Sequence, residues 1–393
     1  MKTNELAHKY AEETIAYRRD IHMHPEPSMQ EFRTTDRICE ELDKLNVSYR
    51  RTNPTGVIAE LKGTLADSDK IVMIRADIDA LSIQEKTDFE FKSVNDGYTH
   101  ACGHDTHNAM LLGAVKVLRD MQNEFAGTVR FCFQPAEEAA EGAKLMIEQG
   151  VMDGVGYAFG IHIDSMTPCG VITGRPGQAQ AGVDWFKIHI KGKTAHGAHP
   201  ELGVDATVAA AQVVNALQTM VSREFHPADP VVVTVGSLVS GSRFNIISGD
   251  AYMEGTSRMY SPDVHRDIDT IMTRIVTDTA HAYRCEAEVE YNKLLEPLEN
   301  DPEAFELGRK SAEKVAPGKF EIIEPMMGGE DFGWYGITGV KTAFYNLGAM
   351  WPEADKVVSL HNESVHFDES ALEVGVALYA QLALDGLEEL NKA

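Results

Sequence analysis

The sequence predicts an α/β protein of two domains, in which a mixed-sheet domain is interrupted by a smaller ferredoxin-like domain. The chain has 393 residues, too many for one ordinary domain. In its first part, short runs rich in Val and Ile alternate with amphipathic segments, which is typical of a parallel or mixed sheet. From Gly182 to about Lys293 the order becomes the βαββαβ layout of ferredoxin-like domains. We therefore expect one domain from residues 1–181 and 294–393, and a second from 182–293.

The first part of the chain is expected to place polar residues at the ends of its strands. It begins with an amphipathic helix over about residues 5–20, which two prolines end. The elements that follow are expected to be a helix at about 32–45, strands in GVIAELKG and KIVMIRADIDAL, a helix at 106–123, a strand in GTVRFCFQPAEE, a helix in EGAKLMIEQG and a strand in YAFGIHI. Three of these strands run directly into polar residues. A functional site is therefore expected at the carboxyl edge of the sheet.

The inserted segment is expected to form a compact sheet with two helices on one face. Its elements are a strand at 184–191, a helix at 204–223, strands at 231–239 and 249–258, a helix at 261–283 and a strand at 285–292. The chain then returns to the first domain through a helix at 302–315, the strand KTAFYNLG and a helix at 368–390. A catalytic domain split by a smaller insert is expected to close over a cleft as a lid does.

Composition limits the classes of partner and the compartment. The net charge of −25 disfavours nucleic acid and anionic membranes, because both are polyanions. No apolar run approaches the length of a membrane span, and the polar start of the chain does not resemble a signal peptide. Five cysteines without a disulfide-scaffold spacing fit a reducing compartment. We expect a cytoplasmic protein that acts on a small molecule.

Four short segments carry the residue types that bind divalent metals. They are HACGHDTHNAM at 100–110, QPAEE at 134–138, GIHID at 160–164 and LHNE at 360–363. The ligand candidates in them are one thiolate, three imidazoles and one carboxylate, from Cys102, His104, Glu138, His162 and His361. Five ligands exceed one tetrahedral shell, so two metals sharing a ligand are predicted. Each residue alone has an ordinary structural explanation, and it is the coincidence of four clusters that favours a metal site.

Three further groups of polar residues accompany these segments. Glu137 precedes the ligand candidate Glu138 and is the natural general base for a metal-activated water. Asp77 and Asp79 end a predicted strand, where polar side chains tend to be functional. His22 and His24 look like another ligand pair, but residues two apart do not share a helix face, so a structural role is expected for both.

The chain resembles the metal-dependent aminoacylase and carboxypeptidase superfamily in motifs that occur in the same order and spacing: RADIDAL, HACGHDTHNAML, QPAEE, GIHI, GKTAHGAHPELGVDA, FNIISGDAYMEGTSRM and GGEDF. Within it, the chain is most similar to the amidohydrolases that include hippurate hydrolase, indole-acetyl-amino-acid hydrolases and N-acyl-amino-acid deacylases. The resemblance covers essentially the whole chain. It implies a dinuclear-metal peptidase-like catalytic domain that binds two divalent ions, of manganese, zinc, cobalt or nickel. The residues to which it gives roles are Cys102, His104, Glu138, His162 and His361 as ligands, Glu137 as general base, and Asp77 as the carboxylate that orients a ligand.

The resemblance also gives roles to residues of the insert. His196 matches a histidine that reaches the partner subunit's site in dimeric relatives and polarises the scissile carbonyl. Asn245 and Arg258 match substrate-binding positions, and a guanidinium can hold a carboxylate bidentately. Without the resemblance, His196 would be a loop residue and Arg258 a surface ion-pair partner. His199 is expected to be structural. The resemblance therefore implies a homodimer, or a tetramer, assembled through a lid and dimerisation domain.

The expected reaction is hydrolysis of the amide bond of N-acyl-L-amino acids to a carboxylic acid and a free amino acid. Arg75 stands where many peptidase relatives carry a metal-binding histidine, and this departure favours the amidohydrolase branch. A dipeptidase or carboxypeptidase remains an alternative, because a peptide presents the same bond beside the same carboxylate. A non-catalytic protein that binds acyl amino acids or metal is a further alternative. The sequence does not indicate which acyl group would be accepted.

Overall fold

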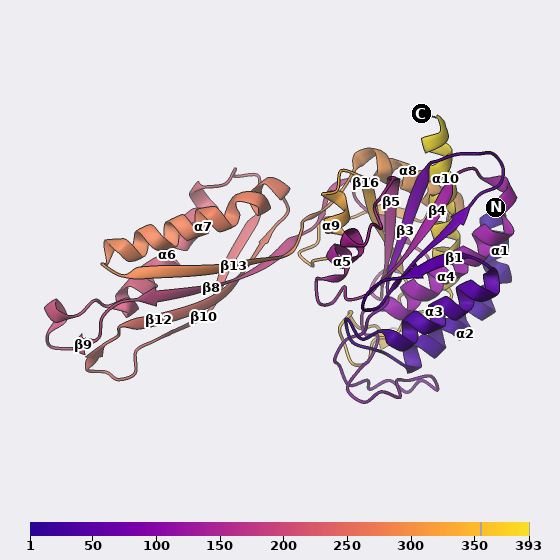
Figure 1. The fold of residues 1–393 in the computed structure, drawn as a ribbon. Coiled ribbons are helices and arrows are strands. Elements are labelled where there is room, and N and C mark those ends of the chain that lie inside the picture. Colours follow the sequence, from indigo (N-terminus) through magenta and orange to yellow (C-terminus); the bar gives the residue numbers. More distant parts are fainter. Residues whose placement is uncertain (354–355, 393) are drawn as a thin grey trace. The chain divides into compact units, whose positions relative to one another are not determined.

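The chain folds into two compact units, each with its own hydrophobic core (Figure 1). The computed structural model describes residues 1–353 and 356–392. The first unit comprises Met1–Gly177, Glu299–Glu324 and Trp334–Ala393, and the second comprises Gln178–Leu298 and Pro325–Gly333. The predicted fold class, a mixed-sheet α/β domain interrupted by an insert, is confirmed.

The first unit is built on an eight-stranded mixed sheet with the strand order β1-β2-β4-β3-β5-β16-β6-β15. Its strands are β1 (Ser48–Arg51), β2 (Val57–Lys62), β3 (Ile71–Asp77), β4 (Thr128–Gln134), β5 (Val155–Asp164), β6 (Ile172–Gly174), β15 (Phe320–Ile322) and β16 (Lys341–Gly348). The strand β3 pairs in parallel with β4 and β5, and β5 pairs in parallel with β16. Four neighbouring strands therefore end at the same edge. Both faces of β3 and β4 are buried along nearly the whole strand. Their sequences are therefore mostly apolar runs, without the alternation of apolar and polar residues that a half-exposed strand shows.

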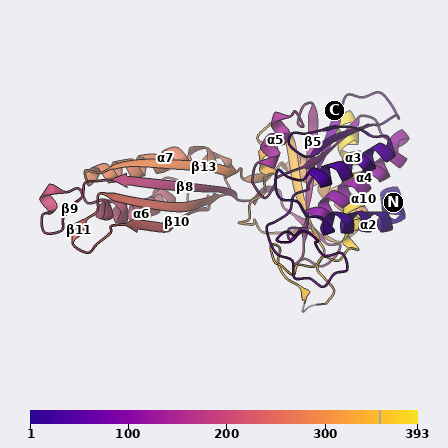
Figure 2. The same cartoon turned by 60° about the horizontal axis from the view of Figure 1, so that its bottom comes forward.

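A layer of helices covers this sheet, and one of these helices begins at the sheet edge where the parallel strands end. The layer consists of α3 (Phe32–Leu45), α4 (His104–Asp120), α8 (Pro302–Val315) and α10 (Ala371–Lys392), with α1 (Lys2–Lys9) and α2 (Ala11–Met23) packed on α4 and α10. The remaining short helices of this part are η1 (Gln122–Glu124), α5 (Gly142–Glu148) and α9 (Gly333–Gly336). Almost all of α4 is buried because it lies between the sheet and other helices (Figures 1 and 2).

The N-terminal helix differs from the expectation. The single helix expected over about residues 5–20 was wrong, because the chain breaks at Tyr10 between α1 and α2. There the Tyr10 hydroxyl donates a hydrogen bond to Asp120 at the end of α4 (2.8 Å). Lys9 donates to the same carboxylate at 2.8 Å. At this break the helix is interrupted, and Lys9 and Tyr10 contact a segment that is remote in the sequence. The periodicity of the local sequence does not reveal such contacts.

The second unit contains a four-stranded antiparallel sheet with the order β10-β12-β8-β13. Its elements are β8 (Gly182–Lys191), β9 (Ala195–His196), η2 (Pro200–Leu202), α6 (Ala206–Arg223), β10 (Val231–Ser240), β11 (Ile246–Ile247), β12 (Asp250–Met259), α7 (Pro262–Ala282) and β13 (Glu286–Leu295), with short strands β7 (Gly177–Gln180) and β14 (Leu298–Asn300) at the unit boundaries. Asp205 caps α6 by accepting the N–H groups of Thr207 and Val208. Both α6 and α7 pack on the sheet, as the βαββαβ pattern predicted.

Across residues 1–353 and 356–392, every helix is too short or too polar to cross a bilayer. The five cysteines form no disulfide bond, and four of them are buried.

Candidate metal centre

The ligand candidates meet at the edge where the parallel strands end. Asp77 is the last residue of β3, Gln134 is the last residue of β4, and His162 lies near the end of β5. The helix α4 begins at His104 beside the same edge, directly after Cys102. Parallel strands with short connections to helices bring such residues together although they are remote in sequence.

The local backbone between Cys102 and His104 requires a glycine. Gly103 has a φ of +84°, which residues with a side chain rarely adopt. A Cβ atom at this position would also lie 2.3 Å from the Ile163 side chain, next to His162. Gly103 therefore allows the two ligand candidates to approach the end of β5 closely.

The structure brings together all five predicted ligands and Glu137. The potential ligand atoms lie within 4.8 Å of one another in each of three overlapping groups, which are Cys102, His104 and His162; Cys102, Glu138 and His361; and His104, Glu137 and Glu138. The Cys102 Sγ lies 3.4 Å from the His162 Nε2 and 3.2 Å from the His361 Nε2. The His361 Nε2 lies 3.5 Å from the Glu138 Oε1. Shared members link the groups into one centre.

His361 is held beside Cys102 by an unusual backbone conformation. Its φ is +60°, in the left-handed region that is costly for a residue with a side chain. Its N–H group donates to the carbonyl of Ala101 at 2.9 Å. This hydrogen bond fixes the ligand loop to the segment that carries Cys102.

Buried atoms without hydrogen-bond partners indicate that the centre fits metal ions. Among the described residues, neither the His104 Nε2 nor the Glu138 Oε1 has a partner, although both are buried. An unsatisfied buried polar group costs about 1–3 kcal/mol, so such atoms are normally paired. Four carboxylates also have an oxygen within 4 Å of His104: Asp77, Asp79, Glu137 and Glu138. A divalent cation at this position would satisfy the orphaned atoms and offset the clustered negative charge.

The pKa values of two ligand candidates also indicate that the centre fits a cation. Burial raises the pKa of the Cys102 thiol well above its usual value. Burial also raises the pKa of Glu138 to about 7, although the nearby His104 opposes the shift. Both groups bind metal in their ionised forms, and burial disfavours those forms. A bound cation would favour ionisation of both groups.

One carboxylate and one backbone carbonyl orient two of the histidine ligand candidates. The Asp79 Oδ1 lies 3.1 Å from the His104 Nδ1, which leaves the Nε2 of that ring for a metal. The His162 Nδ1 donates a hydrogen bond to the carbonyl of Ile163 at 2.6 Å, and the Nε2 of that ring faces the Cys102 Sγ. Both rings therefore present the same nitrogen to the centre.

Asp77 supports the centre through a second histidine. Its Oδ1 accepts a hydrogen bond from the His107 Nδ1 at 2.5 Å, and the His107 Nε2 accepts the N–H of Ile163 at 2.7 Å. Its Oδ2 pairs with the Arg75 Nη1 at 2.6 Å. Although burial opposes it, the positive charges of His104 and Arg75 and the hydrogen bond from His107 hold the pKa of Asp77 well below its usual range. Asp77 thus fixes the backbone next to His162 through His107, which the sequence reasoning had not singled out.

The predicted substrate residues lie in the second unit. His196 in β9 pairs with Ile246 in β11, and the Gly197 N–H donates to the Asn245 carbonyl at 2.8 Å. His196 therefore lies in a small two-stranded sheet, and Asn245 lies in the turn that leads into its second strand. Arg258 lies in β12, where it donates to the Ser257 carbonyl at 2.9 Å.

The remaining histidines named from the sequence have protein partners. His22 lies 2.8 Å from Asp105 and 3.2 Å from Glu85, and it is fully buried. His24 bonds to the backbone of Asp20 at 2.8 Å. His199 lies 3.3 Å from Glu201 on the surface. These contacts suit structural roles.

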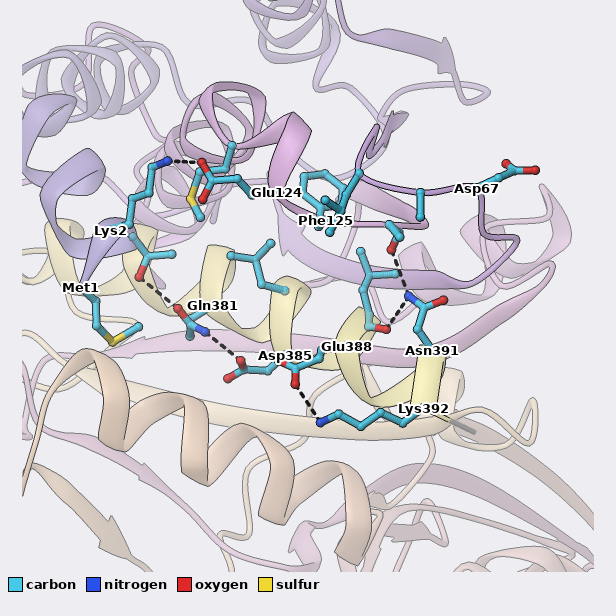
Figure 3. Close-up of a pocket in the computed structure, with 17 residues that line it drawn as sticks. Met1, Lys2, Asp67, Glu124, Phe125, Gln381, Asp385, Glu388, Asn391 and Lys392 are labelled. Atoms are coloured by element: carbon cyan, nitrogen blue, oxygen red, sulfur yellow. Dashed lines mark hydrogen bonds and ion pairs between the residues drawn. The ribbon is translucent and has the colours of Figure 1, made fainter.

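A separate cavity of about 730 Å³ lies at the opposite end of α4 (Figure 3). Its wall includes the apolar side chains of Met121, Phe125 and Leu387, and the ion pair between Lys2 and Glu124 at its rim. The 17 residues of α4 correspond to a length of about 25 Å between this cavity and the metal centre. None of the predicted site residues lines it.

Comparison with known proteins identifies relatives along nearly the whole chain. The model of "Peptidase family M20/M25/M40" matches residues 73–385. The N-acetylcysteine deacetylase of Bacillus subtilis (strain 168) is 37% identical over 386 residues, which cover 96% of this chain and 97% of that protein. Thermostable carboxypeptidase 1 of Saccharolobus solfataricus is also 37% identical, over 94% of both proteins.

A solved structure gives a similar result. The YXEP protein of Bacillus subtilis, described as a dinuclear metal-binding peptidase of the M20 family, has a TM-score of 0.84 and 35% identity. The match covers 97% of this chain and 99% of that chain. The fold is thus that of a known hydrolase family.

Proposed function

The chain belongs to peptidase family M20/M25/M40, and we propose that this hydrolase cleaves the amide bond of N-acyl-L-amino acids with two divalent metals. The observation that carries the proposal is the convergence of one thiolate, three imidazoles and two glutamates at one sheet edge. Cys102, His104, Glu138, His162 and His361 would hold the metals. When bound, the metals would lower the pKa of a water molecule and polarise the amide carbonyl.

Glu137 is the proposed general base. Its Oε2 lies 3.9 Å from the His104 Nε2, so its carboxylate reaches the centre. In the reaction, its carboxylate accepts the proton of the attacking water and then passes that proton to the leaving amine. The side chain is 10% exposed, which limits competition from bulk water for the proton.

Residues of the second unit would complete the site. His196 would donate a hydrogen bond to the oxygen that becomes negative during attack, and it would do so in the partner subunit's site of a homodimer. Asn245 would bind the substrate beside it, which is consistent with the hydrogen bond between the Gly197 N–H and the Asn245 carbonyl. Arg258 would pair with the carboxylate of the amino acid. Sedimentation of the protein tests the dimer, and a monomer with full activity would refute the shared role of His196.

The name of one relative supports an acyl amino acid as substrate, because that relative is an N-acetylcysteine deacetylase. A carboxypeptidase is the second candidate, since a relative with that name is equally identical. Arg75 at a position where many peptidases carry a histidine favours the first candidate. We place the protein in the cytoplasm because its five cysteines form no disulfide bond, which suits a reducing compartment.

The decisive experiment combines metals, substrates and one pair of variants. Chelated protein is reconstituted with zinc, manganese, cobalt or nickel and tested on N-acetyl amino acids, hippurate, indole-acetyl-Ala and dipeptides. Glu137→Gln should reduce kcat by about 10²- to 10⁴-fold while retaining the metals. The control is Glu141→Gln, an exposed glutamate of the same segment, which should retain activity.

The outcomes separate the candidates. Release of free amino acid from N-acyl substrates but not from dipeptides supports the amidohydrolase, and the reverse supports the carboxypeptidase. Near wild-type turnover in Glu137→Gln would show that another group is the base. Metal binding without hydrolysis of any substrate would favour the non-catalytic alternative.

A further inference from the structure

The cavity of about 730 Å³ at the far end of α4 has no part in the proposed reaction (Figure 3). All the residues that line it belong to the first unit. They come from the start of α1, the connection between β2 and β3, the segment after α4 and the last part of α10. Sites for small molecules are typically about 300–1,000 Å³ in volume, so the cavity has the size of such a site.

Much of the cavity wall is apolar. Met121, Phe125 and Leu387 line it and are themselves buried, and Leu384 lines it beside them. Leu65 also lines the cavity but is 63% exposed, so it lies at the mouth. An apolar molecule that entered this cavity would leave water for apolar surface, which is the main driving force for binding such molecules.

The buried polar side chains of the wall are already hydrogen-bonded to one another. The Thr3 hydroxyl donates to the Gln381 Oε1 at 3.1 Å, and the Gln381 Nε2 donates to the Asp385 Oδ1 at 2.8 Å (Figure 3). Asp385 also accepts hydrogen bonds from Ser311 and Lys314, both at 2.6 Å. A strongly polar ligand would have to compete with these bonds, whereas an apolar ligand leaves them intact.

The charged side chains that line the cavity are paired as well. The pairs are Lys2 with Glu124, Lys392 with Glu388, Lys62 with Asp67 and Lys314 with Asp385. The positive and negative charges of these pairs cancel. A charged ligand would therefore have to separate a pair or leave its own charge beside apolar surface, and both are unfavourable.

We propose that this cavity is a binding site for an uncharged small molecule with an apolar ring or chain. The proposal goes beyond the proposed hydrolysis, because the residues proposed to hold the metals and to act as base lie outside the cavity wall. A bound molecule would contact α1, α10 and the segment after α4 together. It would therefore hold both ends of the chain against the first unit, where chain ends otherwise tend to fray.

The first test uses N-phenyl-1-naphthylamine, an uncharged compound whose fluorescence rises when it leaves water. It is titrated into the full-length protein reconstituted with metal. Leu65→Asp places a carboxylate at the mouth of the cavity, and the exposure of Leu65 makes the substitution compatible with folding. The control is Ile337→Asp, because Ile337 is 58% exposed in the first unit but lies outside the cavity wall. Circular dichroism verifies that both variants are folded.

Wild type and Ile337→Asp should bind one probe per chain with Kd values within twofold of each other. Leu65→Asp should bind the probe about tenfold more weakly or worse, because the new carboxylate loses water when the apolar probe covers it. Equal affinity in the two variants would overturn the proposal, because the probe would then bind elsewhere. The lack of saturable binding to wild type would also overturn it.

The second test examines the charge of the ligand by displacement of the probe. Three compounds share one ring system: 2-naphthylmethanol is uncharged, 2-naphthylmethylammonium is a cation and naphthalene-2-sulfonate is an anion. The uncharged compound should displace the probe at a concentration about fivefold lower than either ion, because the charges of the wall are already paired. Displacement by either ion at an equal or lower concentration would overturn the proposed ligand class.

Hydrogen exchange locates the probe without any substitution. An excess of N-phenyl-1-naphthylamine should slow amide exchange in α1 and in the last turns of α10, and it should leave the second unit unchanged. Slower exchange only in residues 100–110 and 134–138 would place the probe at the metal centre and would overturn the proposal. None of these measurements depends on hydrolysis, so failure of the proposed function and failure of this site are distinguishable.

Discussion

Replacing Arg75 by methionine should strongly destabilise the first unit. Arg75 and Asp77 are 1% and 0% exposed, and the Nη1 of the one lies 2.6 Å from the Oδ2 of the other. The Arg75 Nε also donates to the Gln134 Oε1 at 2.8 Å. Methionine fills much of the space but leaves the Asp77 carboxylate buried without its guanidinium. Removing one partner of a buried ion pair costs about 3–5 kcal/mol of the free energy of unfolding.

The chain offers a matched control for this prediction. Arg51 pairs with Asp36 at the same distance of 2.6 Å, but these side chains are 51% and 58% exposed. Arg51→Met should therefore cost only about 0–1 kcal/mol, because water screens the exposed pair. The two substitutions are chemically identical, so the difference between them isolates the effect of burial.

The assay is urea unfolding of metal-free protein, which removes any contribution from bound metal. Trp185 lies in the second unit, whereas Trp334 and Trp351 lie in the first. In a Trp185→Phe background, tryptophan fluorescence therefore reports on the first unit alone. If Arg75→Met and Arg51→Met differ by less than about 1 kcal/mol, the buried pair does not stabilise the sheet edge as argued.

Three further predictions concern stability. Although burial opposes it, hydrogen bonds with Asp184 and Glu296 raise the pKa of His265 to about 9, so its stabilising contribution is complete below the unfolded pKa of about 6.5 and is lost as pH rises toward 9. Urea unfolding of wild type at pH 6 and pH 9.5 should show this decline, and His265→Gln should show a smaller one. Asp205→Ala should cost the second unit about 0.5–2 kcal/mol by removing the cap of α6, measured by urea unfolding followed by Trp185 fluorescence. Chelation should lower the melting temperature of the first unit in calorimetry, because bound metal stabilises only the folded form, and restoring metal should reverse the change.

The sequence predicts the elements of the fold well where burial produces an unbroken apolar run. The strands β3 and β4 are such runs, and each passes directly into polar residues, so the edge that carries the site could be located from the sequence. The break at Tyr10 could not, because its cause is a contact with Asp120, 110 residues away. Local periodicity contains no information about such partners.

The same distinction applies to the centre. Ligand candidates could be chosen because cysteine, histidine and glutamate in four clusters have a shared chemistry. The supporting residues could not be chosen in this way. His107 acts on the backbone beside His162, and Glu31 acts on the backbone of Ala136, which is 105 residues away. Their roles depend on which amides lack partners, and that is a property of the folded backbone. In the sequence, the one indication of a role for His107 is its position three residues after the ligand candidate His104.

The charges of the centre provide an argument for bound cations that does not depend on resemblance. Four carboxylates have an oxygen within 4 Å of a ring nitrogen of His104, and they are Asp77, Asp79, Glu137 and Glu138. With the Cys102 thiolate they give five groups that are negative when ionised, and the Arg75 guanidinium pairs with this cluster through Asp77. Ionising all five groups in a buried place is costly in a region of low dielectric constant unless cations lie among them. Divalent ions held by Cys102, His104 and Glu138 would lower that cost, so the ionised state of these ligand candidates and the binding of metal depend on each other.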